Sequence, residues 1–144
     1  MATKNARGTI YSSGGDILAQ TVTAGDGKET RSYPYDNMFA HIVGYSTKGK
    51  TGLESLANYY LINTSATVAQ QAENSAAGRK NPGNNLYTTL DLGLQQTAYN
   101  AMGIYKGAIV VMEVDTGKIL AMVSKPDYNP NTLAADWDAL VAGD

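Results

Sequence analysis

Residues 107–123 read GAIVVMEVDTGKILAMV, in which two strongly apolar runs flank Asp115-Thr116-Gly117. β-Branched residues favour strands, and Asp and Gly tolerate the backbone conformations of a tight turn. The stretch therefore predicts a β-hairpin with strands at 107–114 and 118–123. Because both strands are almost wholly apolar, we expect both faces of the hairpin to be covered, in part by sequence downstream of residue 144.

The segment before the hairpin predicts a strand followed by a helix. Residues 86–90 form a short strand-like run, and Asp91 stands at the position of a helix N-cap. Leu94, Ala98 and Met102 then recur every four residues, which places them on one face of a helix. Gly103 is suited to end that helix, because glycine readily adopts the backbone conformation of a C-terminal cap.

The first part of the chain favours an antiparallel meander. Three short apolar or β-branched runs, at 9–11, 16–22 and 30–35, are separated by glycine-rich turns at 12–15 and 25–27. Pro34 lacks the backbone donor of a sheet ladder, so it should end the third strand or hold it at an edge.

A helix is predicted after the meander. Its apolar face, at i, i+3, i+4, i+7 and i+8, is formed by Leu53, Leu56, Ala57, Tyr60 and Leu61. Thr51 precedes this face and Glu54 follows three positions later, which is the spacing of a capping box. We therefore expect the threonine hydroxyl and the glutamate carboxylate to satisfy free backbone N–H groups at the start of the helix.

Residues 63–85 are rich in Ala, Gln, Asn, Ser and Gly and read as turn and linker sequence. A domain boundary near residue 84 follows. The predicted fold class is α+β: residues 1–84 form a strand-rich domain with packed helices, and residues 85–144 supply a strand, a helix and a β-hairpin to a larger sheet.

Composition excludes several classes of function. With 144 residues, 43% of them hydrophobic and 17% charged, the chain is in the globular range. A net charge of -2 without a basic run gives no basis for binding nucleic acid or for direct contact with a membrane surface. The absence of cysteine excludes disulfides and thiolate metal sites. No cofactor or metal cage is predicted, and a solvated acidic face is expected at Asp136, Asp138 and Asp144.

The sequence also matches the phosphate-binding P-loop. Residues 44–51 read GYSTKGKT, which fits that motif at every position, and Asp115 after an apolar strand could hold its magnesium ion. Against this, Thr51 already has a place as a helix cap, Asp115 lies in a hairpin turn, and a P-loop fold needs several βαβ units. A nucleotide-binding protein using Gly44–Thr51 remains the alternative function.

Three short motifs lie in the first part of the chain: RGTIY with DILA within 7–19, RSYPY at 31–35 and GKTGLE at 49–54. Together they resemble the motifs of class B penicillin-binding proteins. Residues 7–11, RGTIY, followed by Gly15 and DILA at 16–19, are similar to the first motif, although Ser12 and Ser13 depart from it. Residues 31–35, RSYPY, are similar to the second motif, with Asp36 in place of a glycine. Residues 49–54, GKTGLE, are similar to the third, Gly-x-x-Gly-x-Glu, which accounts for the P-loop match without a phosphate.

Two further motifs in family order resemble the entry to the transpeptidase domain. Thr89-Leu90-Asp91 with Leu94 and Gln95 is similar to its Thr-x-Asp-x-x-Leu-Gln pattern, and residues 107–131 resemble its first hairpin. The motif residues that the resemblance marks as structural are Arg7, Gly8, Arg31, Tyr33, Pro34, Gly49, Gly52, Glu54, Asp91, Gln95, Asp115 and Gly117.

The resemblance implies a pedestal, or dimerisation domain, at residues 1–84 and the start of a transpeptidase domain at 85–144. Such a segment would lie on the extracytoplasmic side of a bacterial membrane, between an upstream transmembrane anchor and a downstream catalytic domain. It would serve the synthesis of peptidoglycan by a serine-type D,D-transpeptidase. The implied partners are a membrane glycan polymerase and cell-division or elongation proteins, with a homodimer as a further possibility.

The motifs of serine acyl transfer are not found in the chain. No serine has a lysine three positions later, and none begins a Ser-x-Asn triplet. Lys50-Thr51-Gly52 matches the basic triad of these enzymes, but it stands at a predicted helix start instead of on a strand. His41, the single histidine, is expected to be packed and hydrogen-bonded. We therefore expect these 144 residues to bind and position without catalysing, and an extracellular interaction domain unrelated to acyl transfer is a third possibility.

The charged residues of the three pedestal motifs suggest a common purpose. Arg7, Arg31 and Glu54 belong to different motifs and carry complementary charges. We expect Glu54 to be bridged by one or both arginines, tying the strands to the helix. A carboxylate has two oxygens, so Glu54 could serve this bridge and the helix cap together.

Overall fold

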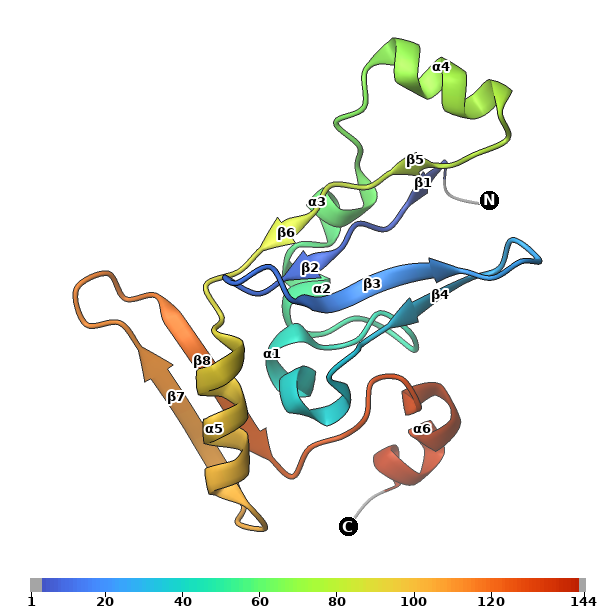
Figure 1. Cartoon of the computed structure of the whole chain (residues 1–144). Helices are drawn as coiled ribbons and strands as arrows, with labels where there is room; N and C mark the ends of the chain where they lie inside the picture. The colour runs from blue at the N-terminus through green and yellow to red at the C-terminus, as the bar shows by residue number, and fades with distance from the viewer. Residues whose placement is uncertain (1–3, 143–144) are drawn as a thin grey trace.

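The computed structural model describes residues 4–142 and has an α+β architecture (Figure 1). The strands are β1 (Asn5–Ala6), β2 (Ile10–Tyr11), β3 (Ile17–Thr23), β4 (Glu29–Ser32), β5 (Asn81–Pro82), β6 (Leu86–Tyr87), β7 (Gly107–Met112) and β8 (Ile119–Lys125). The helices are η1 (Asp36–Phe39), α1 (Ala40–Val43), α2 (Gly52–Leu56), α3 (Asn58–Ile62), α4 (Val68–Ala76), α5 (Leu92–Met102) and α6 (Leu133–Val141). Asp144 lies outside the described residues.

The predicted meander is confirmed. Strands β2, β3 and β4 pair antiparallel, and the sheet has the order β4-β3-β2-β6. Pro34 falls just after β4, as the missing N–H of proline requires. A second, two-residue pairing joins β1 and β5 in parallel, so the first and last segments of this part of the chain lie side by side.

The strand predicted at 86–90 is shorter than expected and joins a different sheet. Only Leu86 and Tyr87 are extended strand, and they pair with β2 and not with the hairpin. Beyond β6 the chain turns toward the hairpin, where the Asp91 N–H donates to Leu120 O at 2.7 Å. The segment 86–91 therefore contacts both sheets.

The helix predicted around residues 53–61 is interrupted, and its predicted face is partly wrong. The chain forms α2 and α3 with a break at Ala57, and Leu56 and Tyr60 are 82% and 63% exposed. The buried positions are Glu54, Ala57 and Leu61. The apolar periodicity was misleading because a glutamate, Glu54, occupies one of the buried positions. The capping box is also wrong, since the Thr51 side chain makes no cap hydrogen bond.

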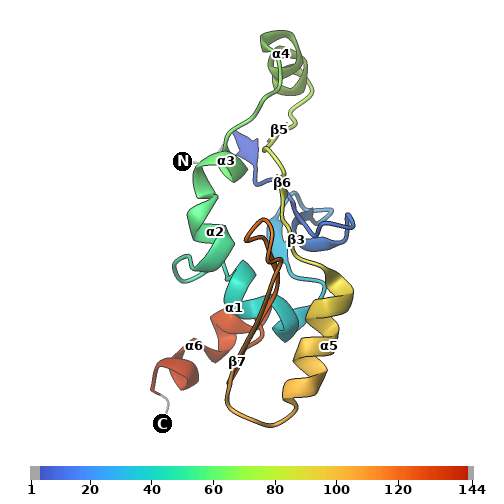
Figure 2. The ribbon, with the colours of Figure 1, turned by 90° about the vertical axis from the view of Figure 1, so that its left-hand side faces the viewer.

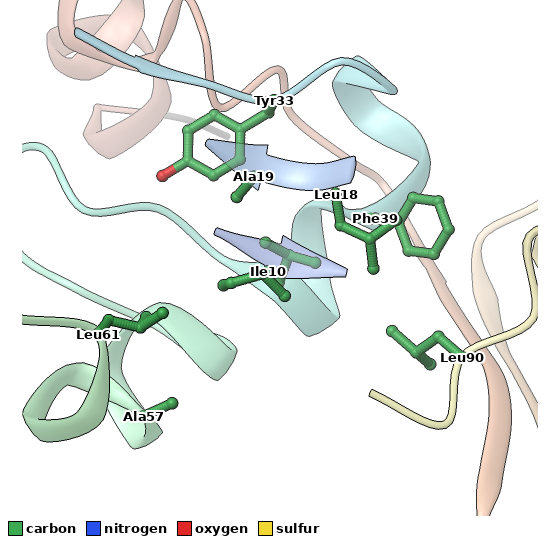
Figure 3. Packing of buried hydrophobic residues seen from close by; sticks show 9 residues of the cluster. Ile10, Leu18, Ala19, Tyr33, Phe39, Ala57, Leu61 and Leu90 are labelled. Atoms are coloured by element: carbon green, nitrogen blue, oxygen red, sulfur yellow. The ribbon is translucent and has the colours of Figure 1, made fainter. Parts of the chain in front are cut away.

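The core packs the meander against η1, α1, α2 and α3 (Figure 3). Its buried side chains are Ile10, Leu18, Ala19, Tyr33, Phe39, Val43, Ala57, Leu61 and Leu90. Leu90 comes from the segment that leads to α5, so this core includes a residue from the connection between the two parts of the chain. Burial of apolar surface on this scale is the main stabilising contribution to a small domain.

Helix α4 lies inside the segment predicted as a linker. Thr67 and Gln70 form a true capping box at its start, and α4 has no buried residue. It projects from the rest of the molecule (Figure 1). At its base, side-chain amides are joined in series, because Asn74 Nδ2 donates to Asn81 Oδ1 and Asn81 Nδ2 donates to Asn5 Oδ1, each at 3.2 Å.

The hairpin forms as predicted and packs on α5 (Figure 2). The Asp91 side chain accepts from Leu94 N at 2.8 Å, which confirms it as the N-cap of α5. Ala98, Met102 and Val123 are buried between α5 and one face of the hairpin. On β7, Val110 and Met112 remain 54% and 56% exposed, so the described residues cover the hairpin incompletely.

Candidate functional site

A buried carboxylate bridges two arginines in the first part of the chain. Arg7 Nε donates to Glu54 Oε2 at 2.6 Å, and Arg31 Nε donates to Glu54 Oε1 at 2.7 Å. The Glu54 side chain is 0% exposed, and those of Arg7 and Arg31 are 13% and 6% exposed. The predicted bridge is confirmed, and it uses both arginines. It ties the strand segments that carry Arg7 and Arg31 to α2.

Further hydrogen bonds fix the orientation of both guanidinium groups. Arg7 Nη2 donates to the Glu54 backbone oxygen at 2.6 Å, and Arg31 Nη1 donates to Gly8 O at 2.7 Å. The Tyr33 hydroxyl donates to Glu54 Oε1 at 3.3 Å. Burial, and then the Glu54 charge, raise the pKa of Tyr33 to about 12, so the phenol stays protonated and remains a donor. We call Arg7, Arg31, Tyr33 and Glu54 the ion cluster.

Two of the motif glycines are required by close packing. A Cβ at Gly8 would lie 1.9 Å from Asn84 O, far inside van der Waals contact. Gly52 has a φ of +55, and a Cβ there would lie 2.5 Å from Ile42 O. Both glycines therefore let backbone segments approach one another around the ion cluster. Gly49, with a φ of +116, serves the turn before α2.

The geometry overturns the P-loop alternative. The residues before Gly44 are helical, in η1 and α1, whereas a P-loop follows a strand. Asp115 lies in the turn between β7 and β8, where Gly117 has a φ of +73 and its N–H donates to Glu113 O at 2.8 Å. Asp115 and Gly117 are thus hairpin-turn residues and not part of a nucleotide site.

Gln95 joins the two parts of the chain from inside. Its side chain is 0% exposed, and its Nε2 donates to Met38 O at 2.8 Å and to Met122 O at 2.9 Å. Its Oε1 accepts from Met122 N at 2.8 Å. The Gln95 side-chain amide thus bonds to both backbone groups of Met122 in β8 and also to a backbone oxygen of η1. The motif identified this glutamine, but its partners could not be read from the sequence.

Asn131 makes a matching connection that the sequence analysis did not single out. Its Oδ1 accepts from Tyr33 N and its Nδ2 donates to Tyr33 O, both at 2.9 Å. Tyr128 and His41 reinforce the contact, since Tyr128 OH donates to Ala40 O at 2.7 Å and His41 Nε2 lies 2.8 Å from Pro126 O. The predicted hydrogen bond of His41 is therefore present, although the residue is exposed. Residues 126–131, here called the clasp, bind η1, α1 and the residue after β4.

Asp127 is the charged group of the clasp. Tyr99 OH donates to Asp127 Oδ2 at 2.6 Å, and Asn37 Nδ2 donates to Asp127 Oδ1 at 3.0 Å. Partial burial alone would raise the pKa of Asp127, but these hydrogen bonds and the nearby Lys125 charge lower it below 3.8. Burial and the hydrogen bond to Asp127 raise the pKa of Tyr99 to about 12. The pair is therefore a neutral phenol that donates to a carboxylate.

The clasp should loosen in acid. A carboxyl group with a depressed pKa in the folded state stabilises the fold above its unfolded pKa, and this contribution is lost as pH falls through the folded value. We expect Asp127→Asn to lower the free energy of unfolding by about 1–2 kcal/mol near neutral pH and to have a vanishing effect in strong acid. Thermal unfolding across pH measures this, with the exposed Asp138→Asn as control. A difference from wild type that does not change with pH would contradict the assignment.

Among residues 4–142 no group of His, Asp and Glu side chains has the arrangement of a metal site. Within the same range, no helix has the length and apolar character needed to cross a bilayer. Asp136 and Asp138 are exposed on α6, as predicted for a solvated face. The motif residues thus form an ion cluster, a helix cap, an amide connection and a hairpin turn in separate places, and they do not converge on one catalytic centre.

Two family models match different parts of the chain. Residues 7–86 match the penicillin binding protein A dimerisation domain, and residues 107–142 match the penicillin binding protein transpeptidase domain. The chain belongs to the penicillin-binding protein family. The ion cluster lies within the match to the dimerisation domain, and the hairpin and clasp lie within the match to the transpeptidase domain. Gln95 falls between the two.

Individual penicillin-binding proteins are similar over most of the chain. The D,D-transpeptidase PbpA of Mycobacterium tuberculosis is 38% identical over 138 residues, covering 90% of this chain and 28% of the relative. The D,D-transpeptidase MrdA of Acinetobacter baumannii is 35% identical over 129 residues, covering 71% of this chain and 19% of the relative. The chain therefore spans under a third of the length of these curated relatives.

Solved structures of penicillin-binding proteins share the fold. The imipenem acyl-enzyme complex of penicillin-binding protein A from M. tuberculosis superposes with a TM-score of 0.83 at 32% identity, covering 98% of this chain and 36% of that chain. PBP2 of Pseudomonas aeruginosa superposes with a TM-score of 0.71 at 31% identity, covering 88% and 30%. The resemblance of the five motifs to those of penicillin-binding proteins is thus confirmed for the family and for the fold.

Proposed function

We propose that these residues form the non-catalytic scaffold of a peptidoglycan D,D-transpeptidase. Residues 1–84 would act as the pedestal, and residues 85–144 would begin the transpeptidase domain. The parent protein would cross-link stem peptides by serine acyl transfer on the extracytoplasmic side of the membrane. The chain by itself would not be acylated, because none of its serines stands in a Ser-x-x-Lys motif.

The observation that carries this proposal is the way in which the hairpin is held. One face of the β7–β8 hairpin packs on α5, while β8 is bound to the first part of the chain through Gln95. In the described part of the chain β7 pairs only with β8, and apolar β7 side chains are more than half exposed. A scaffold that presents a partly uncovered hairpin is suited to receive the remaining strands of a larger sheet.

A surface on α2 and α3 supports a role in binding partners. Leu56, Tyr59 and Tyr60 are 82%, 72% and 63% exposed, and residues 55–72 contain no charged residue. Exposed aromatic groups without charges are typical of the centre of protein interfaces. We propose a membrane glycan polymerase or a division or elongation protein as the partner, with a second copy of this chain as the alternative.

Labelling with a fluorescent penicillin tests the proposed function. A longer chain that extends past residue 144 through a Ser-x-x-Lys should be labelled covalently, and the label should be blocked by unlabelled penicillin. The 144-residue chain, shown to be folded by circular dichroism, should remain unlabelled on a denaturing gel. Labelling of the short chain would contradict the scaffold role. A folded longer chain that takes no label would contradict the transpeptidase assignment.

A further inference from the structure

A cleft, here called the junction cleft, lies where the two parts of the chain meet. It is formed by the β2–β3 turn, the segment 87–91, the start of α5 and the turn of the hairpin, and its volume is about 350 Å³. Small-molecule sites commonly have volumes of about 300–1,000 Å³ and often occur at domain junctions. The ion cluster and the clasp do not use this cleft.

One wall of the cleft is a fixed aromatic ring. Tyr87 is 70% exposed and stacks on Tyr11, with ring centroids 5.0 Å apart and an interplanar angle of 13°. The two tyrosines are directly opposite each other in the parallel pairing of β2 and β6. This cross-strand contact orients the Tyr87 ring and leaves much of its surface open. Because the ring is already ordered, a ligand that binds to it has a smaller entropic cost of fixing this side chain.

The rest of the lining combines polar side chains with two leucines, Leu94 and Leu120, and carries few charges. Asp91 contributes a carboxylate of which Oδ1 accepts from Leu94 N, and Ser13 contributes a hydroxyl that donates to Leu90 O at 3.0 Å. Glu113 and Lys118 approach from the hairpin turn. Two carboxylates and one ammonium group make the lining slightly acidic, which disfavours phosphate-bearing ligands such as nucleotides.

A flat aromatic surface beside carboxylate, hydroxyl and ammonium groups suits a neutral ligand with many hydroxyls and an apolar C–H face. A saccharide has both properties, because its ring C–H groups can pack on the aromatic face while its hydroxyls bind the polar rim. A larger open cleft of about 550 Å³ at the base of α4 has amide and hydroxyl groups and the Glu73 carboxylate in its lining, but no aromatic side chain. The aromatic wall therefore distinguishes the junction cleft.

We propose that the junction cleft binds the sugar backbone of a glycan strand, with Tyr87 as the stacking residue and Asp91 and Glu113 as hydroxyl acceptors. The identity of the glycan as peptidoglycan rests on the proposed function. The site would hold a strand against the scaffold at a place separate from any acylation chemistry. Binding there would be weak and reversible, since one stacked ring and a few hydrogen bonds supply it.

Titration of the folded 144-residue chain with tetra-N-acetylchitotetraose, followed by two-dimensional amide NMR, tests the site. We expect saturable shifts centred on residues 13, 87–91 and 113–118. Tyr87→Leu keeps apolar bulk against Tyr11 but removes the flat ring, and it should weaken binding about tenfold or more. Tyr87→Phe should keep the affinity within about threefold. Tyr105→Leu, at a tyrosine that is 75% exposed in the loop between α5 and β7, is the matched control and should bind as wild type.

Two results would overturn the inference: no saturable shift in wild type at millimolar probe, or equal affinity in wild type and Tyr87→Leu. If Tyr87→Leu proves unfolded, the comparison of Glu113→Gln with wild type decides, because that turn substitution should still weaken binding. Penicillin labelling of the longer chain is independent of this cleft. A failure of glycan binding with intact labelling would therefore reject the glycan site alone.

Discussion

Glu54→Gln should lower the free energy of unfolding by about 3–5 kcal/mol, because it leaves two largely buried guanidinium groups without their counter-charge. The glutamine oxygen can accept from one arginine, but its NH₂ group would face the other. Arg7 and Arg31 are both hydrogen-bonded to fixed backbone oxygens as well, so neither can swing out to water without losing these contacts. For a chain of this size the melting temperature should fall by roughly 10–20 °C.

Thermal and denaturant unfolding followed by circular dichroism measure this effect. The matched control is Glu73→Gln, which removes the exposed pair between Glu73 and Arg79, 3.9 Å apart with side chains 76% and 62% exposed. Exposed pairs contribute little, so the control should stay within about 0.5 kcal/mol of wild type. If Glu54→Gln melted at the wild-type temperature, the ion cluster could not be what holds the strands to α2.

Gln95→Leu should have an effect of similar size, about 3–5 kcal/mol. Leucine nearly fills the volume of the glutamine, so the main loss is the set of hydrogen bonds to Met38 O and to both backbone groups of Met122. Each buried polar group that is left unsatisfied costs about 1–3 kcal/mol. Because these groups lie on both sides of the junction, the variant should also loosen the hairpin from η1.

Hydrogen exchange at the Met122 amide gives a local readout of this change, beside global unfolding. Gln96→Leu is the control, since Gln96 is the exposed neighbour on the same helix and bonds only to Asn100 among the described side-chain contacts. Its stability should remain within about 0.5 kcal/mol of wild type. Unchanged protection of Met122 in Gln95→Leu would show that η1 and β8 are joined by other contacts.

Local signals in the sequence predicted the elements whose side chains follow a simple period. The hairpin, the meander, the Asp91 cap and the end of α5 at Gly103 all depend on turn chemistry or on spacing within one segment. The helix after the meander was less predictable, because a buried glutamate took the place of an apolar residue in its pattern. Tertiary ion pairing at Glu54 outweighed both the apolar periodicity and the capping box.

The polar composition of residues 63–85 predicted a linker, although the capping-box spacing within that segment indicates the start of helix α4. Residues 63–85 look like a linker, yet Thr67 and Gln70 stand at the capping-box distance and do form that box. A search for this spacing inside polar segments would have found the start of α4. Gly78 likewise marks its end, because it has a φ of +65, its N–H donates to Ser75 O at 3.1 Å and the Arg79 N–H donates to Asn74 O at 2.8 Å.

The candidate site was predictable only in part. Complementary charge in separate motifs was enough to bring Arg7, Arg31 and Glu54 together, because opposite charges excluded from water must meet. The contacts of Gln95 and Asn131 could not be predicted, since a side-chain amide can bind any exposed backbone group and spacing does not specify which. The stacking of Tyr11 on Tyr87 depends on a parallel pairing between residues 76 positions apart.

The projecting α4 arm has a consequence for variation within the chain. Its helix gives nothing to the core, whereas its base is fastened through Asn5, Asn74 and Asn81. Length changes before Asn74, in the first turns of α4, are therefore tolerable where changes to those asparagines are not, and these turns are a suitable place to insert an epitope or a fluorescent reporter. The exposed side chains of the arm can therefore be replaced while the framework beneath it keeps its shape.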